Sequence, residues 1–307
     1  MTAIGWSPPV LERHAVVNTP ASGPWTASEV ASLVAGGARV VVSPPVTIDV
    51  RATTEAWTVR EGAAVLTPHR PPTLTVDDFD LAYGDAFGSG VGVMATVTAG
   101  SVDAFAATVS RIARLPVASV QLDFSATNAD DGRSFGYQWA LLEQVLRGAR
   151  ARLNVPLGAR LPAMWDMTSI ETLSLILVRV GADFVTAITD LRIGLVVEHD
   201  TEHDTEHEAG AAGRPWTARI GQLGGRAILP LALANVRMFY ETLGTRIPIV
   251  GSGGVADTAD AIAFLLAGAH AVESGDGDGA TVAEIRDGVA RWSDDVGSGV
   301  RAMVDGL

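Results

Sequence analysis

The chain has 307 residues, carries a net charge of −13 and contains no cysteine. The negative charge disfavours nucleic acid and anionic membranes as partners, and the missing thiols exclude disulfides, iron–sulfur clusters, thiolate zinc sites and a cysteine nucleophile. Hydrophobic residues make up 48% of the sequence, enough for a large core. It shows neither a run of 18 apolar residues nor a basic-then-apolar leader, so we expect a cytoplasmic protein.

Short β-branched runs alternate with helical stretches along the chain, which is typical of βα units around a parallel sheet. We predict eight strands, at Ala15–Asn18, Arg39–Val42, Gly92–Val97, Ser119–Asp123, Leu157–Leu161, Phe184–Ile188, Ile247–Gly251 and Ala271–Glu273. Eight strands with crossover helices close most simply as one α/β domain over residues 1–307, a single (β/α)8 TIM barrel. An open doubly wound sheet is the alternative.

Helix signals lie between several of these strands. Thr26 and Glu29 form a capping box before a helix that ends at Gly36-Gly37. Other helices are expected from Ser101 to about Arg114, from a second capping box of Thr168 and Glu171 to about Gly181, from Pro230 to Leu243, from about Asp257 to Ala267, and after Ala280.

Two segments do not fit the barrel pattern. Residues of about 51–90 are Pro-rich and are predicted to be an irregular insertion. Residues of about 198–214 are predicted to be an acidic loop that contains His199, His203 and His207 at a spacing of four. On a helix these histidines would share one face and could bind a divalent metal, as in a metal-dependent hydrolase. A solvated acidic loop without metal is the preferred interpretation.

Glycines follow the last two predicted strands, in the sequences Gly251-Ser252-Gly253-Gly254-Val255 and Glu273-Ser274-Gly275-Asp276-Gly277. In (β/α)8 barrels the active site lies at the C-terminal ends of the strands, and phosphate is commonly held after the seventh and eighth strands. Glycine lets backbone N–H groups approach a phosphate closely. The sequence therefore predicts a small-molecule site here, and a tight strand-to-helix turn is the alternative.

These residues and others resemble the dihydroorotate dehydrogenases, especially the soluble class 1 enzymes. The similarity is close over residues 223–236, which read LGGRAILPLALANV, and over residues 251–255, followed by Asp260-Ala261 and 267–269. Residues 21–23 resemble the family's first-strand flavin loop, and residues 121–128, which read QLDFSATN, line up with its fourth-strand active-site motif.

The resemblance implies an FMN-dependent barrel, often a homodimer, that oxidises dihydroorotate to orotate. Hydride passes to flavin N5 while a Cys or Ser removes the other proton. Carried over to this sequence, the flavin-binding residues are Ala21, Ser22, Gly23, Arg160, Gly224, Gly225, Gly253, Gly254 and Gly275.

The departures from the family are concentrated on the chemistry. The catalytic base position holds Ala126, and a methyl group takes no proton. Asp123 replaces an asparagine of the family's motif, whereas the motif's last residue, Asn128, is kept. The hydroxyls of Ser125 and Thr127 flank the base position. Elsewhere, the positions of two lysines of the family hold Pro44 and Arg160 in this chain. The family's Asn-Ser pair is replaced by Thr189-Asp190, and its phosphate-site threonine is replaced by Asp276.

The candidate catalytic residues are therefore Asp123, Ser125, Asn128, Arg160 and Asp190. Asp123 is a general base if burial raises its pKa, and otherwise a strand-end carboxylate that accepts from nearby backbone N–H groups. An added carboxylate about 5 Å from a phosphate repels it by about 3 kcal/mol at an effective dielectric of about 20. Asp276 therefore weakens FMN binding, and Asp123 and Asp190 oppose the carboxylate of orotate.

Two main hypotheses follow, and whether the chain is an enzyme stays open between them. The preferred one is a flavin-free barrel that no longer oxidises dihydroorotate. It is either a non-catalytic homologue that binds another small molecule or an enzyme repurposed for non-redox chemistry. The alternative is an FMN-dependent CH–CH oxidoreductase that acts on a non-orotate substrate.

Overall fold

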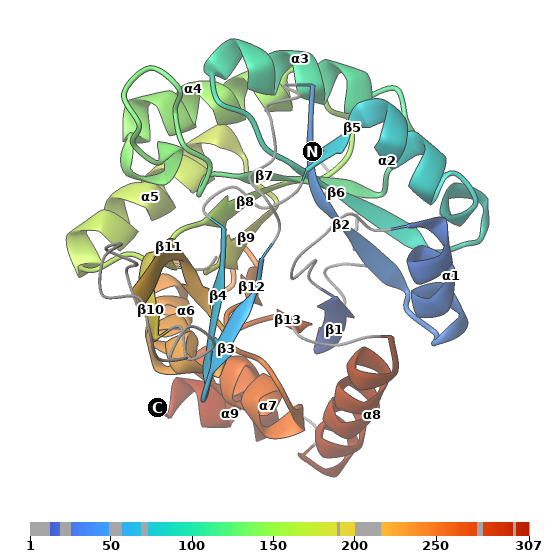
Figure 1. The fold of residues 1–307 in the computed structure, drawn as a ribbon. Coiled ribbons are helices and arrows are strands. Elements are labelled where there is room, and N and C mark those ends of the chain that lie inside the picture. The colour runs from blue at the N-terminus through green and yellow to red at the C-terminus, as the bar shows by residue number, and fades with distance from the viewer. Residues whose placement is uncertain are drawn as a thin grey trace, which may run out of the picture.

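The computed structural model describes residues 13–18, 26–48, 57–68, 73–188, 191–199, 216–274, 279–296 and 299–306. Its main sheet is parallel throughout, in the order β1-β13-β12-β9-β8-β7-β6-β2-β5 (Figure 1). These strands are β1 (Ala15–Asn18), β2 (Val40–Thr47), β5 (Leu74–Thr75), β6 (Gly92–Val97), β7 (Ser119–Asp123), β8 (Leu157–Leu161), β9 (Phe184–Ala187), β12 (Ile249–Gly251) and β13 (Ala271–Ser274). All eight predicted strands are therefore confirmed, and β5 is an additional short strand.

Apart from the short β5, which pairs beside β2, the order of the strands around the sheet is their order in the sequence, which identifies a (β/α)8 barrel and excludes the doubly wound alternative. Asn18 bridges the seam between β1 and β2. Its side-chain amide donates to the carbonyl of Val42 at 2.9 Å and accepts from the backbone N–H of Val42 at 3.0 Å. A side-chain amide carries the same donor and acceptor as a peptide group, so Asn18 stands in for a strand pairing where the barrel closes.

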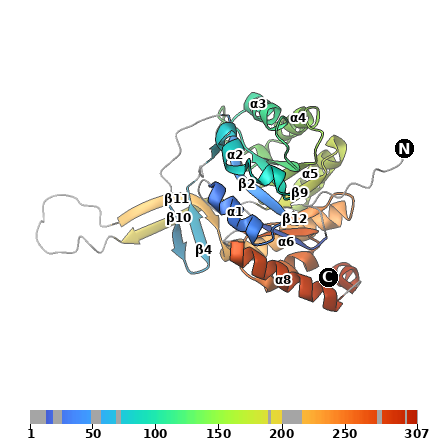
Figure 2. The ribbon, with the colours of Figure 1, turned by 90° about the vertical axis from the view of Figure 1, so that its right-hand side faces the viewer.

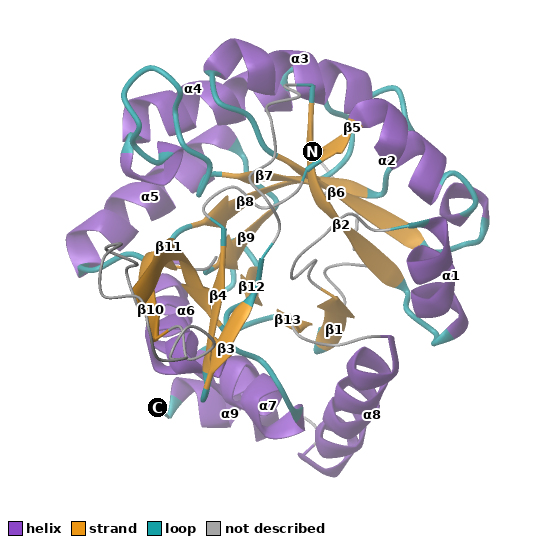
Figure 3. Ribbon diagram, viewed as in Figure 1, coloured by secondary structure: helices purple, strands orange, loops and turns teal. Residues whose placement is uncertain are grey.

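The helices lie outside the ring of strands, as Figure 3 shows by colour. Their apolar faces pack against the strands, and the central core comprises buried side chains from both layers, such as Val41, Phe105 and Leu177. The helices are α1 (Ala27–Ala35), α2 (Val76–Tyr83), α3 (Val102–Ile112), α4 (Trp139–Arg150), α5 (Met167–Val180), α6 (Leu229–Leu243), α7 (Thr258–Ala267), α8 (Gly279–Val296) and α9 (Gly299–Asp305). Among the described residues, no helix is long and apolar enough to cross a membrane.

Most helix starts agree with the capping signals, with one correction. The capping box of Thr26 and Glu29 is present, and Ser101 accepts from the backbone of Ala104 at the start of α3. For α5, however, the predicted capping box of Thr168 and Glu171 is wrong. The cap is Asp166, whose carboxylate accepts from the N–H of Ser169 at 2.8 Å, so the helix begins one residue before Thr168.

The segment of about 51–90 is more regular than predicted. Its described residues form β3 (Val59–Glu61), β4 (Ala64–Thr67), β5 and α2, which begins at the cap Thr75. The prediction of an irregular insertion is therefore wrong for these residues. The prolines fall mainly between the elements, which is why the segment reads as irregular.

A second, antiparallel sheet has the order β10-β11-β4-β3, with β10 at Leu191–His199 and β11 at Trp216–Gly224. The β10–β11 ribbon extends away from the barrel (Figure 2). The ribbon packs closely on two side chains. A Cβ on Gly221 would lie 2.6 Å from the ring of Trp57, and a Cβ on Gly194 would lie 3.1 Å from the side chain of Leu66. Of the predicted acidic loop of about 198–214, the first two residues are the end of β10, and residues 200–214 with His203 and His207 lie outside the described residues.

Candidate functional site

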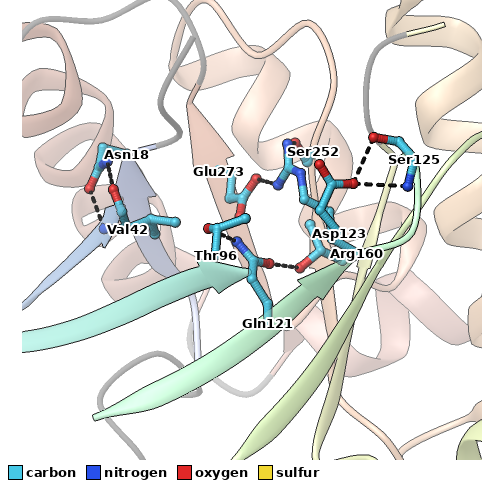
Figure 4. A network of polar contacts seen from close by, with 10 residues as sticks. Asn18, Val42, Thr96, Gln121, Asp123, Ser125, Arg160, Ser252 and Glu273 are labelled. Carbon is cyan, nitrogen blue, oxygen red and sulfur yellow. Dashed lines mark hydrogen bonds and ion pairs between the residues drawn. The ribbon is translucent and has the colours of Figure 1, made fainter. Parts of the chain in front are cut away.

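Five polar side chains converge where β7, β8, β12 and β13 end, at the C-terminal end of the barrel (Figure 4). We refer to them as the C-terminal cluster: Asp123, Ser125, Arg160, Ser252 and Glu273. Three of them are predicted site residues, namely Asp123, Ser125 and Arg160. Five other predicted site residues lie outside the described residues, namely Ala21, Ser22, Gly23, Asp190 and Gly275.

A buried ion pair forms the centre of the cluster. The guanidinium of Arg160 donates through Nη1 to Oε2 of Glu273, and its Nη2 lies 3.4 Å from Oγ of Ser252. The side chain of Arg160 is 14% exposed and that of Glu273 is 0% exposed, so the two charges compensate each other away from bulk water. The cation that the resemblance places beside a flavin is thus already paired with a carboxylate of the chain itself.

Glu273 is a site residue that the sequence analysis missed. Its second oxygen, Oε1, and the hydroxyl of neighbouring Ser274 are buried without a hydrogen-bond partner among the described residues. An acidic residue inside a strand that is otherwise apolar was the available signal, because such a residue is rarely buried without a partner. Arg160 in the fifth predicted strand is the basic residue in a comparable position.

Below the ion pair, polar side chains from β6, β7 and β9 are linked by hydrogen bonds that pass over β8. Gln121 donates to Oγ1 of Thr96 at 3.0 Å and accepts from Oγ1 of Thr186 at 3.0 Å. All three are buried, so this chain fixes the floor of the cluster. Pro44 replaces the second-strand lysine and lies in a register shift of β2, where the backbone N–H of Thr96 donates to the hydroxyl of Ser43.

The loop after β7 uses its polar groups locally. Oδ1 of Asp123 accepts from both the backbone N–H of Ser125 at 2.9 Å and its hydroxyl at 2.6 Å. Arg192 of β10 donates to the carbonyl of Ser125. Oδ1 of Asn128 accepts from the N–H of Asp130 at 3.1 Å. Asp123 thus makes the backbone contacts of a strand-end cap, and the methyl group of Ala126 packs beside the core.

Two glycine segments, Gly224-Gly225 and Gly253-Gly254, meet at the C-terminal end of the barrel. Gly225 has a φ of +72° and Gly254 a φ of +84°, a region that strongly favours glycine. A Cβ on Gly254 would lie 2.8 Å from the carbonyl oxygen of Gly225, and one on Gly253 would lie 3.0 Å from Cβ of Ala232. The segments that hold predicted cofactor residues, Gly224 with Gly225 and Gly253 with Gly254, are therefore in direct contact.

The cation next to these glycines is compensated as well. Arg226 follows Gly225, and its Nη2 lies 2.8 Å from Asp260 and 3.1 Å from Asp257. Both Arg160 and Arg226 are therefore engaged by carboxylates of the chain. The paired side chains at this end of the barrel fit the anionic groups of FMN poorly, although the glycine backbone fits the close approach of a phosphate.

The comparisons with known proteins agree with the fold. The profile of the dihydroorotate dehydrogenase family matches residues 71–290. The chain belongs to this family. A putative dihydroorotate dehydrogenase A (fumarate) of Streptococcus uberis is 31% identical over 156 residues, covering 51% of this chain and 47% of that protein.

A dihydroorotate dehydrogenase (fumarate) of Kluyveromyces lactis is 30% identical over 155 residues, which cover 50% of this chain and 47% of that one. The chain thus spans about half the length of the curated relatives it matches. The resemblance to class 1 enzymes is confirmed by these relatives.

No group of three or more His, Asp and Glu residues that could hold a metal occurs in the part of the chain that the structure describes. His199 is the last residue of β10, and the two other histidines of the repeat lie outside the described ranges. The metal-dependent hydrolase hypothesis therefore gains no support from the described residues.

Proposed function

We propose that this protein is a diverged member of the dihydroorotate dehydrogenase family that binds a small molecule at the C-terminal end of its barrel and does not oxidise dihydroorotate. It acts without bound flavin, either as a non-catalytic homologue or in non-redox chemistry. The observation that carries the proposal is the ion pair between Arg160 and the fully buried carboxylate of Glu273.

The pairing matters because the family's reaction, as the resemblance implies it, needs a cation beside an electron-rich ring and a group that accepts a proton. Arg160 is compensated by Glu273, so its positive charge is largely cancelled for any ligand. At the base position, Ala126 offers no acceptor, and the nearby hydroxyl of Ser125 is engaged with Asp123. Both requirements are missing from the same few strand ends.

The alternative, an FMN-dependent oxidoreductase on a non-orotate substrate, is favoured by the contact between the two glycine segments. This backbone geometry is compatible with a phosphate held after β12. If FMN binds, it supplies a two-electron acceptor, and the chain's own groups orient the substrate. Asp123, three residues before the base position, would then be the candidate carboxylate for accepting a proton.

Absorption spectroscopy and FMN titration separate these two functions. We expect the purified protein to be colourless near 450 nm and to take up less than stoichiometric FMN at about 100 μM, a concentration at which a ligand held with a Kd of about 1 μM would saturate the site. Glu273→Gln removes the negative charge with little change in shape, so this variant is expected to bind FMN more tightly than the parent. Stoichiometric FMN in the parent protein would overturn the flavin-free proposal in favour of the alternative.

Restoring only the base is a second test. We expect Ala126→Cys to show no dihydroorotate oxidation in the presence of excess FMN, because Arg160 stays compensated and Asp123 repels the substrate carboxylate. The measurement is orotate formation by its ultraviolet absorbance, with circular dichroism as the check of folding. Turnover in this single variant would show that only the base separates the chain from its relatives, contrary to the proposal.

A further inference from the structure

A cavity of about 230 Å³ lies at the opposite end of the barrel from the C-terminal cluster. Its lining includes residues directly before three adjacent strands: Arg13 and His14 before β1, Pro248 before β12, and His270 before β13. Tyr240 of α6 and Val304 of α9 also line it. The cavity therefore lies at the N-terminal ends of the strands and shares no lining residue with the C-terminal cluster.

Basic side chains gather at this cavity although the chain carries a net charge of −13. Arg13, His14 and His270 come together from two strand starts. Burial, together with the neighbouring Arg13 and His270, lowers the pKa of His14. Since positive neighbours disfavour its protonation, a negatively charged ligand in the cavity would relieve this repulsion.

His14 is held in an uncommon backbone conformation. Its φ is +64°, in the left-handed region that non-glycine residues rarely adopt. Its N–H donates to the carbonyl of His270 at 2.8 Å, and its Nδ1 lies 2.7 Å from Oγ of Ser293 in α8. With Nδ1 engaged by Ser293, Nε2 is the ring nitrogen that a ligand would meet. Such conformations persist only where the surrounding structure holds them, and they are common at ligand sites.

No Asp or Glu is among the described residues that line the cavity, and the lining residue Tyr240 is bonded to an acidic side chain of α9. Tyr240 donates its hydroxyl to Oδ1 of Asp305 at 2.8 Å, and Cζ of Arg237 lies 5.7 Å from the centroid of the Tyr240 ring. Pockets for drug-sized ligands usually enclose about 300–1,000 Å³, so a cavity of 230 Å³ suits a smaller molecule.

We propose that this N-terminal cavity binds a small oxyanion of the phosphate class, such as a compact phosphorylated metabolite, through Arg13, His14 and His270. Arginine and histidine donate charge-assisted hydrogen bonds to phosphate oxygens, and these are stronger than bonds between neutral groups. Active sites of such barrels lie at the other end, so the site is one of binding rather than of catalysis.

Titration with inorganic phosphate at constant ionic strength tests the proposal. Binding is measured by calorimetry and by NMR of the histidine C2–H signals. The signals of His14 and His270 are expected to shift together and to saturate. Arg13→Gln and His270→Gln should each weaken phosphate binding about tenfold, which corresponds to about 1.4 kcal/mol. The matched control is Arg114→Gln, at an exposed arginine two residues after the end of α3, which should leave the affinity unchanged.

Phosphate bound only at the glycine segments would leave both histidine signals in place, and that result would overturn the proposal. Equal shifts with chloride at the same ionic strength would do so too. Arg13 is exposed, so Arg13→Gln should fold normally even if His270→Gln does not. Unchanged phosphate affinity in a folded Arg13→Gln variant would contradict the site, whether or not the C-terminal end binds FMN.

Discussion

At the C-terminal end of the barrel, the glycine segments and the polar side chains differ in what holds them. Gly225 and Gly254 are fixed by close backbone packing, because a Cβ on Gly254 would collide with the carbonyl of Gly225. The polar side chains are instead held by contacts with one another, namely the ion pair of Arg160 with Glu273 and the hydrogen bond of Ser125 to Asp123. The glycine packing is thus part of the fold itself, whereas the chemistry of a site depends on side chains that one fold can carry in many combinations.

The largest expected effect comes from removing one partner of the buried ion pair between Arg160 and Glu273. Arg160→Met leaves the carboxylate of Glu273 buried without its counter-charge, so we expect a loss of about 3–5 kcal/mol in the free energy of unfolding. The double variant Arg160→Met with Glu273→Leu should recover most of this loss, since replacing a whole buried pair by apolar groups is often neutral. Chemical denaturation of the three proteins measures both effects. If the single and double variants are equally unstable, the pair is not the electrostatic unit described here.

The barrel strands could be predicted from sequence because strands buried on both faces give short, continuous apolar runs. β6, β7 and β8 begin and end where these runs do. The antiparallel sheet could not be predicted, because β11 pairs with β4, which precedes it by about 150 residues in the chain. Such distant pairing leaves no local pattern, and the exposed face of β10, with Ile193 and Leu195, reads neither as a buried strand nor as a turn.

The next largest expected effect on stability comes from the close contact between Gly254 and Gly225. Gly254→Ala places a methyl group 2.8 Å from a carbonyl oxygen at a φ of +84°, so we expect a loss of about 2–4 kcal/mol from strain and overpacking. Gly90 is a matched control, because its φ is +83° and a Cβ there would meet nothing within 4 Å. Gly90→Ala should therefore cost only about 1–2 kcal/mol. Equal losses in thermal denaturation would mean that the contact with Gly225 adds nothing beyond backbone strain.

The C-terminal cluster could be predicted only in part. Arg160 and Asp123 stand at strand ends that the sequence locates, so their position was readable, whereas the partner of each was not. Glu273 pairs with Arg160 although the two are 113 residues apart in the chain. Ser125 donates a hydrogen bond to Asp123 only because the chain turns directly after β7. Sequence locates a charge on a strand end, but which side chain compensates it depends on how the barrel closes.

The smallest expected effect concerns the loop after β7 and sharpens the interpretation of Asp123. If its carboxylate mainly holds the turn, Ser125→Ala should lower stability by about 1 kcal/mol, because one of two hydrogen bonds to Oδ1 is lost. Asp123→Asn should then make Ser125→Ala less harmful, so the two variants are coupled in a double-mutant cycle. Strictly additive losses of stability would indicate that Asp123 does not depend on Ser125, and would leave its carboxylate available for a ligand in the C-terminal cluster.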